Sequence, residues 1–154
     1  KHPKTMQKNA LHILLADDDE DDRLFFKDAF EEVKIQTQVE FAFDGMQLME
    51  YLLQSDVKLP DILFLDLNMP KKTGKECLAE IKQNQRLKNI IIAIYSTSAS
   101  EEDIEDTFVY GANIYIKKPN NFNDLKKIIN EVLTINWHYQ TSGLNRDNFL
   151  LRLQ

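Results

Sequence analysis

The sequence has very little cysteine and no long apolar run. Its single cysteine, Cys77, cannot form an internal disulfide, which favours a reducing, intracellular setting. A helix that crosses a membrane needs about 20 consecutive apolar residues, and none of the apolar runs approaches that length. The first residues (Lys-His-Pro-Lys-Thr-Met-Gln-Lys-Asn) also lack an apolar signal core. We therefore expect a cytoplasmic protein with no membrane contact.

Basic residues are also too few for a nucleic-acid partner. The chain has 19 Lys and Arg against 25 Asp and Glu, a formal net charge of −6. Direct binding of nucleic acid depends on clustered Lys and Arg that neutralise phosphates. A glycine-rich loop that would hold a nucleotide phosphate is missing as well, since carboxylates follow the first apolar segment. We therefore expect no direct nucleic-acid partner and no nucleotide loop.

What the chain does contain is a fivefold alternation of two kinds of segment. At 154 residues it is most simply one domain. Five short apolar segments predict buried strands, and they span residues 10–16, 39–43, 62–65, 90–95 and 113–116. Apolar residues at helical spacing follow each of them, within 24–33, 46–53, 77–81, 104–108 and 122–133. This alternation predicts an α/β fold, a doubly wound five-stranded parallel sheet with helices on both faces.

The last residues do not fit the alternation. We assign residues 10–134 to the domain and 135–154 to a C-terminal extension. The extension is rich in apolar side chains, namely Trp137, Leu144, Phe149, Leu150, Leu151 and Leu153. The simpler interpretation is a short helix packed on its own domain. The alternative is a contact with a partner or a second copy, because exposed apolar patches often mark interfaces.

Polar side chains follow four of the predicted strands, at the edge where a doubly wound sheet binds its ligands. Carboxylates brought together there repel one another unless a cation lies among them. Oxygen ligands at such an edge suit Mg²⁺, and a lysine and a hydroxyl beside them could bind the oxygens of a phosphate. The residues in question are Asp17, Asp18, Asp66, Asn68, Ser96 and Lys118.

The motifs around these residues resemble those of the response-regulator receiver domain, the phospho-acceptor half of two-component signalling. The resemblance covers roughly residues 10–134 and implies the flavodoxin-like strand order 2-1-3-4-5. Each motif alone is a weak signal, but five in the same order and spacing are strong. They are Ile-Leu-Leu-Ala-Asp-Asp at 13–18, Leu-Asp-Leu-Asn-Met-Pro at 65–70 with Gly74, Tyr-Ser at 95–96, Gly-Ala-Asn at 111–113 and Tyr-Ile-Lys-Lys-Pro at 115–119.

The resemblance implies a role for each acidic site residue. Asp66 would be the phospho-acceptor, attacking the phosphohistidine of a partner kinase to form an acyl phosphate. Asp18 and Asp66 would bind Mg²⁺ directly, with the backbone carbonyl of Asn68 as a third protein ligand. Asp17 would hold a water bound to the metal.

The resemblance also implies roles for the other residues at the edge. Lys118 would pair with a phosphoryl oxygen, and its peptide bond to Pro119 would be cis. Ser96 would hydrogen-bond the phosphoryl group, and Tyr115 would then swing inward behind it. The change would alter the face made by the fourth helix, fifth strand and fifth helix.

The expected protein is a stand-alone receiver and not an enzyme, because it would promote only its own phosphorylation and dephosphorylation. Its expected donor is a sensor histidine kinase or a histidine phosphotransfer protein, and its output is contact with a downstream protein. A homodimer is possible, and a receiver-like adaptor that is never phosphorylated is the alternative function.

Several residues have simpler interpretations. The acidic residues at 19–22 are interpreted as a solvated start of a helix with no ligand role, and Tyr115 could be a static aromatic residue. Cys77 is expected to pack in the core, and His12 to be structural. Thr97 departs from the family, which usually has alanine there, and so leaves the phosphoryl lifetime open.

Two other classes of site fit the sequence less well. A calcium-binding EF-hand would need a glycine and a closing glutamate, which the acidic run from Asp17 lacks. A phosphatase of the haloacid dehalogenase type would need a second acid two residues after Asp66, where the chain has Asn68.

Overall fold

The computed structural model describes residues 10–135 and 146–151, which form a five-stranded parallel sheet between helices. The strands lie in the order β2-β1-β3-β4-β5, and each neighbouring pair is parallel. Their bounds are β1 Leu11–Ala16, β2 Thr37–Ala42, β3 Ile62–Leu65, β4 Ile91–Ser96 and β5 Ile114–Lys117. The predicted fold class and strand order are confirmed.

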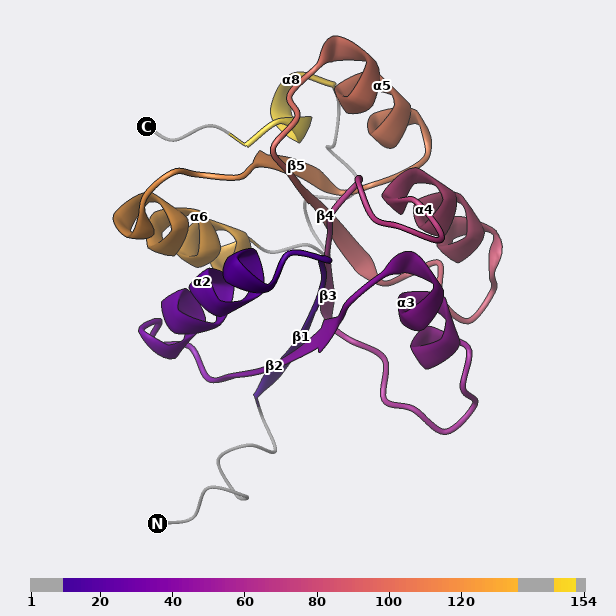
Figure 1. The fold of residues 1–154 in the computed structure, drawn as a ribbon, viewed down its shortest axis with the longest axis horizontal. Helices are drawn as coiled ribbons and strands as arrows, with labels where there is room; N and C mark the ends of the chain where they lie inside the picture. The colour runs from indigo at the N-terminus through magenta and orange to yellow at the C-terminus, as the bar shows by residue number, and fades with distance from the viewer. Residues whose placement is uncertain (1–9, 136–145, 152–154) are drawn as a thin grey trace.

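Helices cover both faces of the sheet (Figure 1). Helices α2 and α6 lie on one face, while α3, α4 and α5 lie on the other. Their bounds are α2 Glu20–Glu31, α3 Gly45–Leu52, α4 Gly74–Gln83, α5 Glu101–Val109 and α6 Phe122–Thr134, with a four-residue helix α8 Arg146–Phe149 in the C-terminal extension. None of the helices within the described ranges is long and apolar enough to cross a membrane.

The alternation of side chains along each strand divides the core into two layers. Leu14 and Leu63 point to the layer under α3, α4 and α5, whereas Ile13 and Phe64 point to the layer under α2 and α6. The second layer contains a cluster of aromatic rings with centroids 4.8–6.3 Å apart, made by Phe26, Phe30, Phe64 and Tyr95. Because the central strands are buried on both faces, their sequences read as continuous apolar runs.

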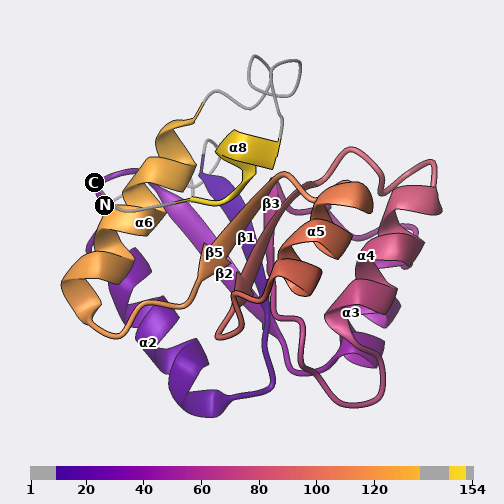
Figure 2. The ribbon, with the colours of Figure 1, turned by 90° about the horizontal axis from the view of Figure 1, so that it is seen from above.

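The end of the described chain packs against α5 and β5 (Figure 2). Phe149 is fully buried, and its ring lies 5.4 Å from that of Phe108 and 6.1 Å from that of Tyr115. The next residues run beside β5, where the N–H of Leu151 donates to the carbonyl of Tyr115 at 3.0 Å. The other apolar residues named in the extension, Trp137, Leu144 and Leu153, lie outside the described residues.

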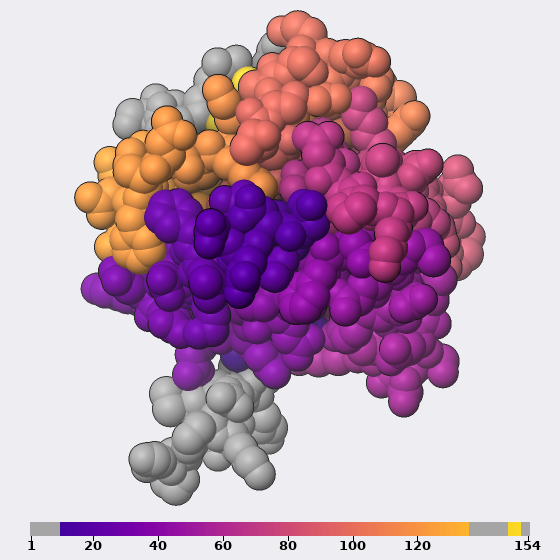
Figure 3. All heavy atoms as spheres, in the orientation of Figure 1, coloured from indigo at the N-terminus to yellow at the C-terminus, as the bar shows by residue number. Residues whose placement is uncertain are grey.

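The loops that follow the strands come together on one side of the molecule. In the orientation of Figure 3, the start of α2, the segment leading into α4 and the segment leading into α6 adjoin on the visible face. This is the edge at which the sequence places its polar side chains.

Candidate functional site

Three of the predicted acidic residues lie together at the carboxyl ends of β1 and β3. These strands are neighbours in the sheet, and the N–H of Asp66 donates to the carbonyl of Ala16 at 3.0 Å. One carboxylate oxygen from each of Asp17, Asp18 and Asp66 lies within 4.8 Å of the others. Asp17 and Asp66 are buried, while Asp18 is exposed to solvent. The carboxylates thus form a cluster that is open on one side.

Lys118 reaches this cluster from the end of β5. Its backbone N–H donates to the carbonyl of Ser96 at 2.8 Å, which fixes the start of the loop. Its ammonium nitrogen lies 2.8 Å from Asp17 Oδ2 and 3.6 Å from Asp66 Oδ2. No peptide bond among residues 10–135 and 146–151 is cis, so our prediction of a cis bond before Pro119 is wrong. The trans isomer is also the one that an X–Pro bond favours by about 0.5–1 kcal/mol without tertiary constraints.

The electrostatics of the cluster raise the pKa of its two buried carboxylates, Asp17 and Asp66. Burial raises the pKa of Asp66 to about 6, the charges of Asp17 and Asp18 add to this effect, and Lys118 opposes it. Burial likewise raises the pKa of Asp17. For Lys118, burial acts to lower the pKa, but the close carboxylates of Asp17 and Asp22 outweigh it and raise the pKa above its ordinary value. One ammonium is therefore too little charge for this cluster.

A divalent cation suits this arrangement. Asp17 Oδ2 is buried and lies near Lys118 Nζ, yet it accepts no well-directed hydrogen bond, so one lone pair of a buried carboxylate is poorly used. Asp18 and Asp66 present oxygen ligands on its open side, which are the ligands that hard divalent cations bind. The N–H of Asn68 donates to Asp66 Oδ1 at 3.4 Å, and the role of its carbonyl as a ligand stays a prediction.

The loop after Asp66 is shaped by a close approach of backbone to backbone at Gly74. The N–H of Gly74 donates to the carbonyl of Leu67 at 2.9 Å. A Cβ at position 74 would overlap the Asp66 carbonyl and come within 2.7 Å of Leu67 Cα. Helix α4 begins directly there, with a complete capping box between Thr73 and Glu76. Glycine is thus required for the loop that presents Asp66.

Ser96 and Tyr115 lie behind the site, on β4 and β5. The buried Ser96 hydroxyl accepts from the N–H of Ser98 at 3.1 Å. The Tyr115 ring is also fully buried, and its hydroxyl donates to the Ser98 carbonyl at 2.8 Å. The side chain that we expected to swing inward is therefore already inside, with Phe149 packed against its ring.

Asp22 is a site residue that the sequence interpretation missed. We interpreted it as part of a solvated helix start, but its Oδ2 lies 2.8 Å from Lys118 Nζ and accepts a hydrogen bond from it. Asp19 is the N-cap of α2, which makes Asp22 the third residue of the helix. Its partner Lys118 lies far away in the sequence, so no local pattern indicated the contact.

Thr97 lines a cavity of about 390 Å³ beside the site, together with Phe25 and Pro119.

Cys77 and His12 both lie in the interior, where the sequence analysis expected them to have structural roles. Cys77 is buried in the core, and burial raises the pKa of its thiol to about 12. His12 is buried on β1 and lies 3.2 Å from the Glu40 carboxylate.

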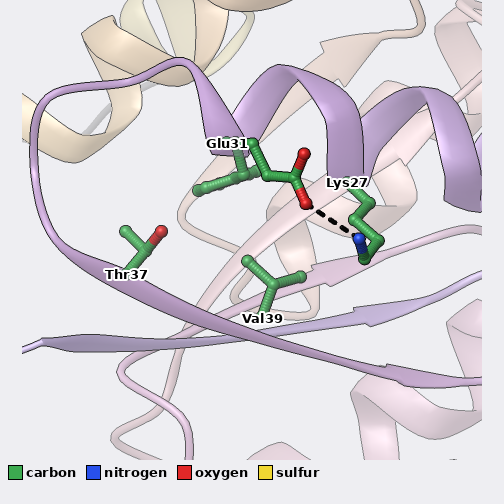
Figure 4. A pocket seen from close by; sticks show the side chains of 5 residues that line it. Lys27, Glu31, Thr37 and Val39 are labelled. Carbon is green, nitrogen blue, oxygen red and sulfur yellow. Dashed lines mark hydrogen bonds and ion pairs between the residues drawn. The ribbon is translucent and has the colours of Figure 1, made fainter. Parts of the chain in front are cut away.

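A second cavity, of about 220 Å³, lies between α2 and β2 (Figure 4). It is lined by Lys27, Phe30, Glu31, Thr37 and Val39. The Lys27–Glu31 ion pair at its rim spans 2.8 Å and joins the end of α2 to its preceding turn. None of the predicted site residues lines this cavity.

Comparisons with known proteins agree with the geometry. The family model for the response regulator receiver domain matches residues 13–130. The response regulator Rcp1 of Synechocystis sp. is 35% identical over 121 residues, covering 76% of this chain and 82% of the relative. The probable methanogenesis regulatory protein FilR2 of Methanothrix harundinacea is 32% identical over 123 residues, covering 78% and 79%.

Two solved structures are similar over most of both chains. The phosphorylated cyanobacterial phytochrome response regulator RcpA has a TM-score of 0.75 at 33% identity, covering 88% of this chain and 97% of that one. The Mn²⁺-bound form of Rcp1 has a TM-score of 0.74 at 32% identity, covering 81% and 93%.

Proposed function

Because the chain belongs to the response regulator receiver domain family of two-component signalling, we propose that it is a phospho-accepting switch with Asp66 as its acceptor. The observation that carries this proposal is the placement of Asp66. It is a nearly buried carboxylate, 5% exposed, with two further carboxylates and an ammonium group around it. Phosphorylated RcpA and Mn²⁺-bound Rcp1 support the same chemistry in relatives.

The proposed reaction moves one phosphoryl group from a histidine to an aspartate. An oxygen of Asp66 attacks the phosphorus of a phosphohistidine on a sensor histidine kinase or a histidine phosphotransfer protein. A P–O bond forms as the P–N bond breaks, and the imidazole leaves with the electron pair of that bond. The product is an acyl phosphate on Asp66. The chain promotes this step and the later hydrolysis on itself alone, so we do not class it as an enzyme.

The residues around Asp66 have distinct parts in this proposal. Asp18, Asp66 and the Asn68 carbonyl would hold Mg²⁺, with Asp17 acting through a water. When bound, the metal supplies charge that offsets the phosphoryl oxygens. Lys118, 3.6 Å from Asp66 Oδ2, moves onto a phosphoryl oxygen. The Ser96 hydroxyl, which accepts from the N–H of Ser98, would donate a hydrogen bond to another phosphoryl oxygen.

The output would be a change on the face that α5, β5 and the described extension form together. Ser96 and Tyr115 both bond to Ser98 in the β4–α5 loop, so a shift of Ser96 toward the phosphoryl group disturbs the partner of Tyr115. A downstream protein that reads this face in the cytoplasm would receive the signal.

Intact mass spectrometry after incubation with acetyl phosphate tests the proposed reaction. With Mg²⁺ we expect the mass of one phosphoryl group to be gained, and with EDTA in place of Mg²⁺ we expect almost none. Borohydride reduction before digestion should mark the acceptor on the peptide that contains Asp66. No gain with Mg²⁺, or a mark on another peptide, would contradict the proposal and favour the unphosphorylated adaptor.

Thermal unfolding tests the metal site without any phosphorylation. Mg²⁺ at ten times its dissociation constant should stabilise the fold by about 1.4 kcal/mol, or roughly 3–6 °C for a chain of this size. The reason is that the cation relieves repulsion between carboxylates whose ligand oxygens lie within 4.8 Å of one another. Asp18→Asn should reduce this shift, while Asp28→Asn, which removes an exposed charge farther along α2, should keep it. Equal shifts in both variants would place the metal elsewhere.

A further inference from the structure

Lys118 has more carboxylate partners than the proposed chemistry uses. Its ammonium lies 2.8 Å from Asp17 Oδ2, 2.8 Å from Asp22 Oδ2 and 3.6 Å from Asp66 Oδ2. An ammonium group has three N–H donors. The contact with Asp22 also has the geometry of a hydrogen bond and is as short as the contact with Asp17. One close partner of the lysine is therefore a residue outside the three-carboxylate cluster.

The backbone that carries Asp22 is held in place at the start of α2. The backbone N–H of Asp22 donates to the N-cap side chain of Asp19 at 3.1 Å. The adjacent Arg23 donates through Nη1 to the carbonyl of Asp17 at 2.9 Å and stacks on the ring of Phe43 at 4.1 Å. Helix α2 thus starts at a fixed position relative to the site, so Asp22 can follow Lys118 only by moving its side chain.

The pair between Asp22 and Lys118 is partly shielded from water. The side chain of Lys118 is 9% exposed and that of Asp22 is 35% exposed. Ion pairs that are fully exposed to water contribute little to stability, and shielding a pair from water strengthens the attraction between its charges. The Asp22 contact is therefore strong enough to compete with another anion for the same ammonium.

We propose that Asp22 is a positioning residue that restrains Lys118 and so weakens its hold on the phosphoryl group. This inference rests on the proposed function. When Asp66 is phosphorylated, the lysine leaves the Asp22 carboxylate or shares its protons between two anions. Either way, part of the attraction between Lys118 and the phosphoryl oxygens is lost, and the acyl phosphate is shorter-lived than it would be with a neutral residue at position 22.

The test compares Asp22→Asn with a matched control, Asp21→Asn. Both remove one negative charge from the first turn of α2, but the Asp21 side chain is exposed and the Asp22 side chain bonds to Lys118. Asp22→Glu, which keeps the charge, should stay close to the wild type. Melting temperatures of the three variants show that each is folded.

The probe is beryllofluoride, which mimics a phosphoryl group on a carboxylate, in the presence of Mg²⁺. Isothermal titration should show that Asp22→Asn binds it about threefold to tenfold more tightly than Asp21→Asn, as expected for a partly buried ion pair. Affinity for Mg²⁺ alone should be the same in these two variants. After acetyl phosphate is removed, the half-life of the phosphorylated Asp22→Asn protein should lengthen by a similar factor.

Two results would overturn the inference, and they differ from failure of the proposed function. Weaker beryllofluoride binding in Asp22→Asn would mean that Asp22 aims Lys118 at the phosphoryl group and does not restrain it. Equal binding in the Asp21 and Asp22 variants would mean that only the net charge matters. A wild-type protein that neither binds beryllofluoride nor accepts a phosphoryl group would overturn both proposals.

Discussion

The Asp66→Asn variant should stay unphosphorylated in acetyl phosphate and Mg²⁺, and in metal-free buffer it should unfold at a higher temperature than the wild type. The first effect follows because the amide is not a carboxylate nucleophile. The second follows because burial raises the pKa of Asp66 from 3.8 to about 6. A carboxyl group whose pKa is raised by folding destabilises the fold once it is ionised. The gain at pH 7 should be about 1–3 kcal/mol.

The sign of this effect also predicts its pH dependence. Between pH 3.8 and about 6 the folded wild type binds more protons at Asp66 than the unfolded chain does, so its stability falls as the pH rises through this window. The advantage of Asp66→Asn should vanish well below pH 3.8 and be fully developed well above pH 6. Urea unfolding at a series of pH values measures it, with Asp28→Asn as a control for a lost exposed charge. Undiminished phosphorylation of Asp66→Asn would refute the assignment of the acceptor.

Phe149→Ala should lower the free energy of unfolding by about 3–5 kcal/mol, the usual cost of removing a buried phenylalanine ring. The Phe149 side chain is fully buried between the rings of Phe108 and Tyr115. Its loss would leave a cavity over Tyr115 and loosen the pairing of Leu151 with β5. Urea denaturation measures the change in the free energy of unfolding.

Two controls make the Phe149 experiment specific. Phe149→Leu keeps an apolar side chain in the cavity and should lose much less than Phe149→Ala. Leu24→Ala removes an apolar side chain that is 53% exposed on α2, and it should change the stability by about 0.5 kcal/mol or less. A loss below about 1 kcal/mol in Phe149→Ala would mean that the extension does not pack on the domain in solution.

The sequence predicts the central strands of the sheet well because each of them is marked by its own run of apolar residues. β3 is buried along its whole length, and its predicted bounds at 62–65 are those in the structure. β2 begins at Thr37, two residues before the prediction, because it is an edge strand with mostly half-exposed residues. An apolar run marks only the buried part of such a strand.

The site is predictable where a residue directly follows a strand, and not where it depends on distant contacts. Asp66 and Asp17 lie at strand ends, so topology alone brings them together. The bond between Asp22 and Lys118 joins residues 96 positions apart, and no local pattern reports it. The contact between Phe149 and Tyr115 is also long-range in sequence. The apolar residues of the extension predicted only that it would pack against some protein surface, and not which one.

The close approach at Gly74 gives the proposed phosphorylation site one stiff wall. Backbone lies against backbone there, the loop is closed by the bond from Gly74 to Leu67, and a capping box starts α4 at once. The opposite wall is held differently, by side-chain bonds of Ser96 and Tyr115 to Ser98. Rotating a hydroxyl exchanges such bonds easily, but backbone segments packed this closely have no room to move. If Asp66 is the acceptor, as we propose, the room for its phosphoryl group would be made on the side of α5, and the signal would leave Asp66 in that direction.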